Sequence, residues 1–386
     1  MVSVLKVGIV GAGAVNFGYP DKLWGHVNKL EKLGGISIVS IVDIDIEKAE
    51  NILKSRRSSP KFGHIYKDCQ VFADFKQLIA LSPDIAIIGI PPGVRGSLED
   101  GKDVELQFVK AGIHLLVEKP LSISPREQFE RYRETLVSEA EKRHVIISVG
   151  FMFRYHSAVE KMKELIKEHG GKVMAVSVKF YCAYTGTADR FWFNNNRVFG
   201  SVIAEHVSHF CDLTRYITDC EIDLSSVQCM MLKVPDAAGK LAHLPEGLED
   251  ENTQECEERR VARVTVAQWR FIEAGIGTFI HTVCLPGTRY ESGIDVHLDG
   301  LSFSLIDPFG EQACKLRVRT LADATPDVDE YYTYDTYGED DMYKTELETF
   351  LKAVRTNDPT SIRSSYSDAA NTQDFIYKLE ENAKRN

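Results

Sequence analysis

The sequence lacks any apolar run of the roughly 18 residues that a membrane-spanning helix needs. Its first residues, MVSVLKVGIVGAG, also lack the basic segment and apolar stretch of a secretory signal. The basic residues are dispersed and outnumbered by acidic ones, and the formal net charge of −11 opposes binding to a nucleic-acid backbone. We therefore expect a cytoplasmic protein that binds neither a membrane nor a nucleic acid.

The eight cysteines contain no CxxC pair and form no cysteine–histidine cluster at the spacing of a zinc site. They are scattered singly along the chain. We interpret them as reduced and mostly buried thiols, and the sequence predicts no metal site.

The length and the residue pattern predict two domains, because 386 residues exceed one ordinary core. The first 150 residues alternate short apolar runs with segments of helix length, which is typical of a parallel sheet covered on both faces. The runs are LKVGIVG, ISIVSIVD, DIAIIGIP, IHLLVEKP and HVIISVG. We predict a doubly wound α/β domain over residues 1–150.

After Gly150 the pattern changes to long strand-like segments with few helices between them. Strands are expected at 172–181 and in SSVQCMMLKV, RVTVAQWRF, GIGTFIHTVC, YESGIDVHLD, GLSFSLID and KLRVRTL. Helices are expected at about 157–169, 201–217, 340–355 and 366–383. The prediction is a second, α+β domain over 151–386, with a large and mostly antiparallel open sheet and with closing helices in 340–386. The polar, acidic segment 236–260 is predicted to be a mobile loop.

A glycine turn follows the first apolar run, in the sequence GIVGAGAVN. Glycine allows a tight turn and a close approach of the backbone to a pyrophosphate. The third glycine of a GxGxxG motif is replaced by asparagine. We predict a dinucleotide site formed by Gly11, Gly13, Ala14, Val15 and Asn16.

The second run ends at Asp43, whose carboxylate can accept hydrogen bonds from a ribose diol and repel a 2′-phosphate. The interval from Gly11 to Asp43 is longer than the usual ~20 residues, because NFGYPDKLWGH lengthens the connection. We expect NAD as the cofactor, with NADP as the alternative. Asp43 could instead be a solvated strand end, and Asp45 is a second candidate for the ribose contact.

Two later runs end in loops with proline, and ligands of such sheets bind outside the carboxyl ends of the strands. Pro91 and Pro92 end one run, and the other ends in Glu118, Lys119 and a proline that biases Lys119 towards extended backbone. We place Pro91, Pro92, Glu118 and Lys119 at the cofactor. Glu118 either braces the lysine or contacts the ribose, and the alternative for the whole motif is a charged surface turn.

The segment GSVIAEHVSHFCDLTRYI predicts a helix that carries Glu205, His209 and Asp212 on one face. A histidine that exchanges protons near neutral pH benefits from a nearby carboxylate. The alternatives are an ordinary helix ion pair, a histidine in the core, or two ligands of a metal for which no third ligand is evident.

Together these motifs resemble the Gfo/Idh/MocA oxidoreductases, which include glucose–fructose oxidoreductase and inositol dehydrogenase. The resemblance includes the glycine turn, the PP and EKP loops, the acid-x-x-x-His helix and the closing SYSDAANTQDFIYKL segment. It implies a Rossmann domain and an α/β substrate domain, in a homodimer or homotetramer. It also implies hydride exchange between a nicotinamide and the hydroxyl-bearing carbon of a sugar, a polyol or another cyclic alcohol.

Matching of the motifs residue by residue implies that Lys119 is the catalytic lysine and His209 the catalytic histidine. The histidine would accept the proton of the substrate hydroxyl while the lysine stabilises the developing alkoxide. Glu205 stands in place of the usual aspartate, and Ser201 in place of one of two usual glycines.

Further polar and aromatic side chains are candidates for the substrate site, with packing between domains as the alternative. They are Arg154, Tyr155, His156, Trp192, Asn195, Arg197 and His206.

Two other functions stay open at this point. One is a dinucleotide-binding regulator without turnover. The other is a reductase of a C=C or C=N bond in secondary or pigment metabolism, which the aromatic FWF segment allows.

Overall fold

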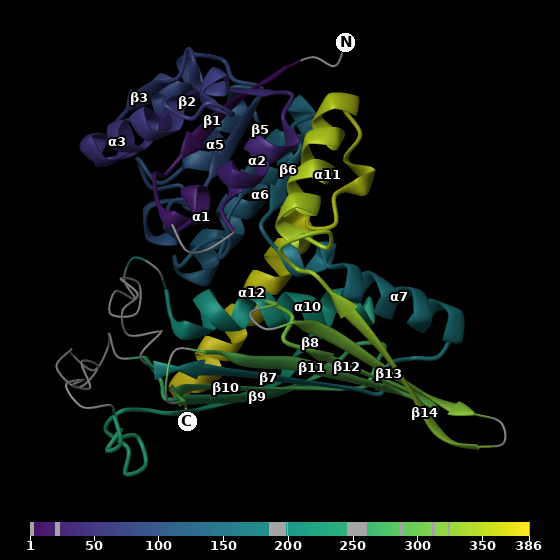
Figure 1. Cartoon of the computed structure of the whole chain (residues 1–386). Helices are drawn as coiled ribbons and strands as arrows, with labels where there is room; N and C mark the ends of the chain where they lie inside the picture. Colours follow the sequence, from purple (N-terminus) through teal and green to yellow (C-terminus); the bar gives the residue numbers. More distant parts are fainter. Residues whose placement is uncertain are drawn as a thin grey trace. The chain divides into compact units, whose positions relative to one another are not determined.

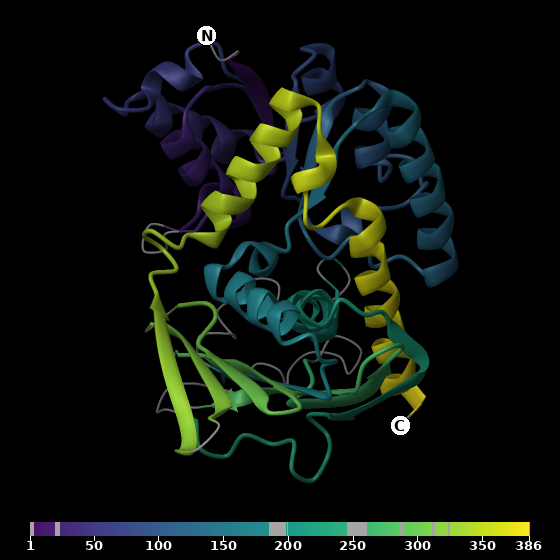
Figure 2. The same ribbon diagram turned by 90° about the vertical axis from the view of Figure 1, so that its right-hand side faces the viewer.

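The computed structural model describes residues 4–19, 24–184, 198, 200–244, 261–285, 287, 289–310, 313–322 and 325–385. The chain forms two compact units (Figures 1 and 2). Unit 1 comprises Met1–Tyr155 and Asp341–Ala370, and unit 2 comprises His156–Asp340 and Asn371–Asn386. The sequence placed the domain boundary at residue 150 and assigned residues 341–370 to the second domain. The structure includes these residues in unit 1.

Unit 1 contains a parallel sheet of six strands in the order β3-β2-β1-β4-β5-β6. The strands are β1 Leu5–Val10, β2 Ile36–Val42, β3 Gln70–Phe72, β4 Ile85–Ile88, β5 His114–Val117 and β6 Ile147–Val149. This is the order of a doubly wound dinucleotide-binding fold, so the predicted fold class is confirmed. Strand β3 was missed because its three residues form no apolar run.

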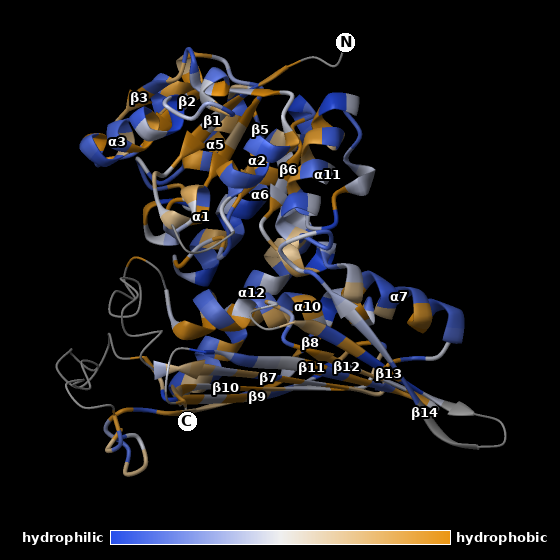
Figure 3. Cartoon of the chain, in the orientation of Figure 1, coloured by the Kyte–Doolittle hydropathy of each residue, from blue (hydrophilic) through white to orange (hydrophobic). Residues whose placement is uncertain are grey.

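Helices cover both faces of this sheet. They include α1 Ala14–Phe17, α2 His26–Leu33, α3 Ile46–Arg57, α4 Phe75–Ala80, α5 Val104–Lys110, α6 Arg126–Arg143 and α11 Met342–Thr356. One core joins strands β1, β2 and β4 to Leu30 of α2, Leu53 of α3 and Phe350 of α11. On the other face, Leu78 of α4 packs directly on Gly8 of β1. Figure 3 shows hydrophobic strands around β1 and β5 and a largely hydrophilic α3.

Helix α11 is held in unit 1 by a buried ion pair as well as by apolar contacts. Lys29 Nζ on α2 lies 2.6 Å from Asp341 Oδ2, and the two side chains are 0% and 3% exposed. Burial lowers the pKa of Lys29, and the hydrogen bond that Lys29 donates to Asp341 opposes that effect. Asp341 also caps α11 by accepting a hydrogen bond from the Lys344 N–H at 3.0 Å. One aspartate therefore starts the helix and connects it to α2.

Unit 2 contains a sheet of eight strands in the order β14-β13-β12-β11-β7-β10-β9-β8. The strands are β7 Ala175–Ala183, β8 Ile222–Leu232, β9 Val264–Phe271, β10 Ile276–Leu285, β11 Glu291–Leu298, β12 Leu301–Ile306, β13 Cys314–Ala322 and β14 Thr325–Tyr334. All neighbouring pairs are antiparallel except β7 with β10, so the predicted mostly antiparallel sheet is confirmed. The acidic edge strand β14 was missed because its sequence, TPDVDEYYTY, is rich in charge.

Within its described residues, unit 2 has the helices α7 Ser157–His169, the π-helical turn η4 Ile203–Val207, α10 Ser208–Thr218 and most of α12 Tyr366–Arg385. Helices α7 and α10 lie on one face of the eight-stranded sheet (Figures 1 and 2). Residues of β9 alternate between buried and exposed, as in a strand that packs on the core with one face and has its other face in solvent. The predicted loop at 236–260 lies largely outside the described residues.

Every helix within the described ranges is too short or too polar to span a lipid bilayer.

We expect the Lys29→Met variant to lose about 3 to 5 kcal/mol of unfolding free energy, because it leaves Asp341 as an uncompensated buried charge. Urea denaturation followed by circular dichroism measures this loss. The matched control is Lys32→Met on the exposed side of the same helix, which should stay within about 0.5 kcal/mol of the parent chain. Equal stability of the two variants would contradict the role of the pair.

Candidate functional site

The turn after β1 requires glycine at position 11. Gly11 has φ +101°, and a β-carbon there would lie 2.9 Å from the Gly89 carbonyl oxygen. The side chain of Asn16 is fully buried, and its Nδ2 donates hydrogen bonds to the carbonyls of Val10 at 3.0 Å and Gly11 at 2.7 Å. Asn16 therefore fixes the shape of the turn, whereas the sequence suggested that it contacts the cofactor.

The residues after Gly11 leave room for a phosphate ligand. A β-carbon at Gly13 would meet no atom within 4 Å. Gly13, Ala14 and Val15 are all partly exposed. Helix α1 has only four residues and ends at Gly18, so its dipole is short. The fit to a pyrophosphate therefore rests on exposed backbone and open space rather than on a long helix.

Asp43 lies at the end of β2 and is held by two backbone groups. Its Oδ2 accepts a hydrogen bond from the Ala12 N–H at 2.6 Å, and its Oδ1 accepts one from the Asp45 N–H at 2.9 Å. Each carboxylate oxygen has a second lone pair, and the side chain is partly exposed. These features fit a ribose diol. Asp45 instead caps α3, by accepting from the Lys48 N–H at 3.0 Å.

The loops after β1, β4 and β5 leave the sheet side by side. The Gly89 N–H donates to the Val10 carbonyl at 2.9 Å, and the Glu118 N–H donates to the Ile88 carbonyl at 2.9 Å. Neighbouring strands lie about 4.8 Å apart, so the loop after β5 starts about 10 Å from the glycine turn. Lys119 is thus placed within unit 1 at the edge where ligands of such sheets bind.

A buried arginine fixes the backbone around Lys119. The guanidinium of Arg95, which is 0% exposed, donates hydrogen bonds to the carbonyls of Ile90 at 3.0 Å and Pro120 at 2.8 Å. It also donates to the carbonyls of Glu118 and, at 3.2 Å, Leu121. The Lys119–Pro120 peptide is cis. One side chain therefore holds the loop after β4 and both sides of Lys119.

The charge of Arg95 is balanced inside the protein. Its Nη1 lies 2.8 Å from Glu105 Oε1, and both side chains are 0% exposed. Glu105 Oε2 accepts a hydrogen bond from the Tyr132 hydroxyl at 2.7 Å. Burial, together with Glu105, raises the pKa of Tyr132 well above its ordinary value, so this hydroxyl stays protonated and donates. Sequence reasoning missed this group, because the three residues come from a loop, α5 and α6 and form no motif.

Glu118 is paired with a histidine from the start of α2. His26 Nε2 lies 2.7 Å from Glu118 Oε1, and the two side chains are 4% and 16% exposed. Burial alone would raise the pKa of Glu118. The hydrogen bond to His26 and the nearby charges of Lys119 and Arg95 outweigh this effect, so the pKa is lowered. The carboxylate therefore contacts α2, a partner that the sequence did not indicate.

The helix predicted at 201–217 in unit 2 is not regular. It begins with the π-helical turn η4 and continues as α10. Such turns occur often at functional sites. The Ser201 hydroxyl donates to Glu380 Oε1 at 2.5 Å and accepts from the Ala204 N–H at 3.2 Å. This serine, which stands in place of a usual glycine, thus connects the start of the helix to α12.

Glu205 and His209, the two candidates on this helix, are both partly exposed. The ring of His209 meets that of Phe309 edge to face, with 6.2 Å between the ring centroids. Asp212, three residues after His209 in α10, is 1% exposed, and its Oδ1 accepts from the Thr372 hydroxyl at 2.9 Å. Its carboxylate therefore contacts α12.

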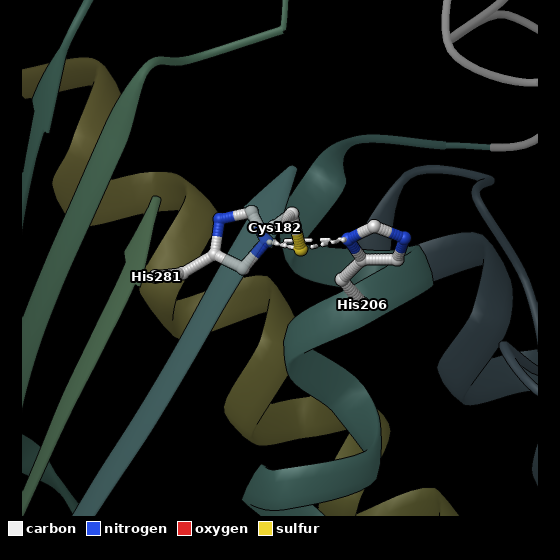
Figure 4. Close-up of side chains that lie close together, drawn as sticks. All are labelled: Cys182, His206 and His281. Atoms are coloured by element: carbon white, nitrogen blue, oxygen red, sulfur yellow. Dashed lines mark hydrogen bonds between the residues drawn. The ribbon is translucent and has the colours of Figure 1, made fainter. Parts of the chain in front are cut away.

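His206 was proposed to contact substrate, but its ring lies against the covered face of the sheet. Its Nδ1 lies 3.6 Å from Cys182 Sγ and 3.2 Å from His281 Nε2 (Figure 4). Sequence reasoning missed Cys182 and His281 as members of a site, because they are far from His206 in the chain.

The other substrate candidates have different positions. Arg154 and Tyr155 are each 2% exposed. Arg154 binds the Arg363 carbonyl and the Asp368 carboxylate, and the Tyr155 hydroxyl accepts from the Arg363 N–H at 3.0 Å. These contacts join the two segments of unit 1, a role that the sequence did not predict.

Four more candidates remain. His156 caps α7, because its Nδ1 accepts from the Ala158 N–H at 3.0 Å. Trp192, Asn195 and Arg197 lie outside the described residues.

Comparison with known proteins decides the family. Residues 5–151 match the model of the oxidoreductase family with an NAD-binding Rossmann fold, and residues 154–301 match an oxidoreductase C-terminal domain. The uncharacterized protein UNK4.17 of Schizosaccharomyces pombe is 32% identical over 388 residues, which cover 97% of this chain and 91% of that protein. The chain belongs to the Gfo/Idh/MocA oxidoreductase family.

Other relatives agree with this assignment. Inositol 2-dehydrogenase of Rhodococcus jostii is 25% identical over 377 residues, which cover 93% of this chain and 82% of that enzyme. Levoglucosan dehydrogenase, solved in complex with NADH and levoglucosan, has the same fold with a TM-score of 0.73. It is 15% identical in sequence, and the superposition covers 99% of this chain and 98% of the levoglucosan dehydrogenase chain. This member of the Gfo/Idh/MocA family is therefore a dehydrogenase or reductase with an NAD-binding Rossmann domain.

We expect Asp43→Asn to lower the preference of the enzyme for NAD over NADP by about 10- to 100-fold, since it removes a charged hydrogen-bond acceptor and the repulsion of a 2′-phosphate. The amide oxygen can still accept from the Ala12 N–H. The ratio of kcat/KM for the two cofactors measures the effect. Asp45→Asn is the matched control, and an unchanged ratio in Asp43→Asn would contradict the ribose contact.

Arg95→Lys should lower kcat by about 100-fold, because lysine cannot reach the carbonyls on both sides of Lys119 and small displacements of catalytic groups are costly. The KM for NAD should change less than kcat, and steady-state kinetics separates the two parameters. The exposed Arg131→Lys serves as control. A folded Arg95→Lys enzyme with normal kcat would exclude the positioning role.

Proposed function

We propose that this oxidoreductase exchanges a hydride between NAD and the hydroxyl-bearing carbon of a sugar, a polyol or another cyclic alcohol. The observation that carries the proposal is the position of Lys119. It lies at the carboxyl end of β5, two strands from the glycine turn, on a loop that the buried Arg95 holds in place. A cation fixed at this edge suits stabilisation of an alkoxide beside a nicotinamide.

The substrate class is supported by the names of two relatives. One is an inositol 2-dehydrogenase and the other a levoglucosan dehydrogenase solved with NADH and levoglucosan. Both names denote cyclic compounds with several hydroxyl groups, so related alcohols are the first class to screen.

The cofactor contacts follow from the geometry of unit 1. We assign the pyrophosphate to the exposed backbone of Gly13, Ala14 and Val15, and the adenosine ribose to Asp43. Pro91, on the loop after β4, is partly exposed, and Pro92 beside it is buried. We assign these two prolines and the backbone of 118–119 to the nicotinamide end, because they follow the neighbouring strands β4 and β5.

The reaction needs a hydride acceptor, which NAD supplies when bound, and a group that takes the hydroxyl proton. In this proposal the imidazole of His209 accepts the proton of the substrate hydroxyl, and Lys119 Nζ stabilises the alkoxide oxygen that forms. The carboxylate of Glu205, four residues before His209, would stabilise the protonated imidazole of His209. In the reverse direction His209 returns the proton to the oxygen.

Lys119→Ala and His209→Ala should each lower turnover by about 10²- to 10⁴-fold, because each removes a group that acts on the reacting oxygen. Affinity for NADH, measured by fluorescence titration, should stay within about threefold because neither residue is assigned to the pyrophosphate or adenosine contacts. Turnover is followed as NADH formation with a panel of inositols, pyranoses and anhydrosugars.

The exposed variants Lys110→Ala and His297→Ala are the matched controls and should keep normal turnover. Near-normal turnover in Lys119→Ala or His209→Ala would exclude the assigned role. A parent chain that binds NADH but oxidises none of the panel would favour the regulatory alternative.

A further inference from the structure

Three side chains of the metal-binding type meet on the covered face of the eight-stranded sheet. Cys182 comes from β7, His281 from the neighbouring parallel strand β10 and His206 from the π-helical turn η4 (Figure 4). Cys182 Sγ lies 3.4 Å from His281 Nε2 and 3.6 Å from His206 Nδ1, and the two nitrogens are 3.2 Å apart. All three elements belong to unit 2.

The triangle of ligand atoms has the size that a tetrahedral zinc ion imposes. With Zn–N bonds of about 2.05 Å and a Zn–S bond of about 2.3 Å, tetrahedral angles place two nitrogens about 3.4 Å apart and a nitrogen and a sulfur about 3.6 Å apart. The observed separations are 3.2 Å for the nitrogens, and 3.4 and 3.6 Å for sulfur to nitrogen. An ion would therefore need little movement of these side chains.

Hydrogen bonds among the three groups leave one of the three contacts without a proton of its own. A ring nitrogen either carries a proton and donates or carries a lone pair and accepts, and a thiol has one proton. If one nitrogen donates and the other accepts, two protons serve three contacts. If both nitrogens are in the same state, their contact at 3.2 Å is repulsive. A cation that accepts a lone pair from each group satisfies all three.

The surroundings keep the lone pairs available. Cys182 and His281 are 0% exposed. The ring of Phe180 lies 5.2 Å from that of His206 and 5.5 Å from that of His281, and Phe279 stacks on His281. His281 Nδ1 meets no hydrogen-bond partner among the described residues, so Nε2 is the engaged nitrogen.

One side of the cluster is more open than the rest. His206 is partly exposed, whereas the other two residues are buried. Three protein ligands with an open fourth position are typical of zinc sites that bind water or another small ligand. A thiolate and two imidazoles favour Zn²⁺ over Mg²⁺ or Ca²⁺, which prefer oxygen.

We propose that Cys182, His206 and His281 bind one divalent transition-metal ion, with Zn²⁺ as the best match. On binding, the Cys182 thiol releases its proton to solvent, and Sγ, His206 Nδ1 and His281 Nε2 each donate a lone pair to the ion. The ion ties the π-helical turn, which also carries Glu205, to strands β7 and β10. The proposal revises the sequence-based expectation of no metal, and it is independent of the roles assigned to Lys119 and His209.

The test is a titration of the metal-depleted full chain with Co²⁺, which reports a cysteine ligand through a thiolate-to-cobalt absorption band in the near ultraviolet. We expect one equivalent of Co²⁺ to develop the band and one equivalent of Zn²⁺ to abolish it. Cys182→Ser should lose the band. Cys229→Ser, at another buried cysteine of unit 2, is the matched control and should keep it.

A second variant keeps the test decisive if Cys182→Ser fails to fold. His206→Asn changes a partly exposed ligand and should weaken Zn²⁺ binding by at least about tenfold. It should also reduce the rise in thermal unfolding temperature that Zn²⁺ gives the parent chain. Absence of the band in the parent chain, its retention in Cys182→Ser, or equal Zn²⁺ affinity of parent and His206→Asn would overturn the proposal.

Discussion

The fold of the NAD-binding unit depends on one buried cation. The guanidinium of Arg95 donates hydrogen bonds to carbonyls of the loop after β4 and of the loop after β5, and Glu105 neutralises its charge. Without this side chain several buried carbonyls would lose their partners, and each such loss costs about 1 to 3 kcal/mol. The backbone at Lys119 is thus determined by a residue that does not itself need to meet any ligand.

Unit 2 positions its candidate residues by a different means. The π-helical turn is connected to α12 by Ser201 and Glu380, and the following helix by Asp212 and Thr372. The cluster of Cys182, His206 and His281 connects the same turn to the sheet. Glu205 and His209 therefore lie on a helix that is held from two directions. A turn of irregular geometry needs such support, because it lacks the regular pattern of α-helical hydrogen bonds.

The sequence predicted those features that are local in the chain. The apolar runs predicted the strands of the parallel sheet. The glycine turn follows β1 and Asp43 follows β2, as the sequence predicted. The spacing of the glycine motif did not predict that the Asn16 side chain fits inside the turn and binds its carbonyls. The strands β3 and β14 lack the apolar patterns on which prediction relies. Neither the Arg95–Glu105–Tyr132 group nor the metal-type cluster could be predicted, because each unites residues whose proximity arises only from tertiary packing.

Through helix α2 the NAD-binding unit depends on the end of the chain. His26 at its start pairs with Glu118 beside the catalytic lysine candidate, and Lys29, one turn later, pairs with Asp341. Leu347 and Phe350 of α11 also belong to the core under the sheet. The nucleotide-binding unit is therefore discontinuous in sequence, and a fragment of the first 150 residues would expose apolar surface that the full chain covers. The two segments of this unit must meet before its core is complete, so its folding has to wait for residues translated after the whole eight-stranded sheet.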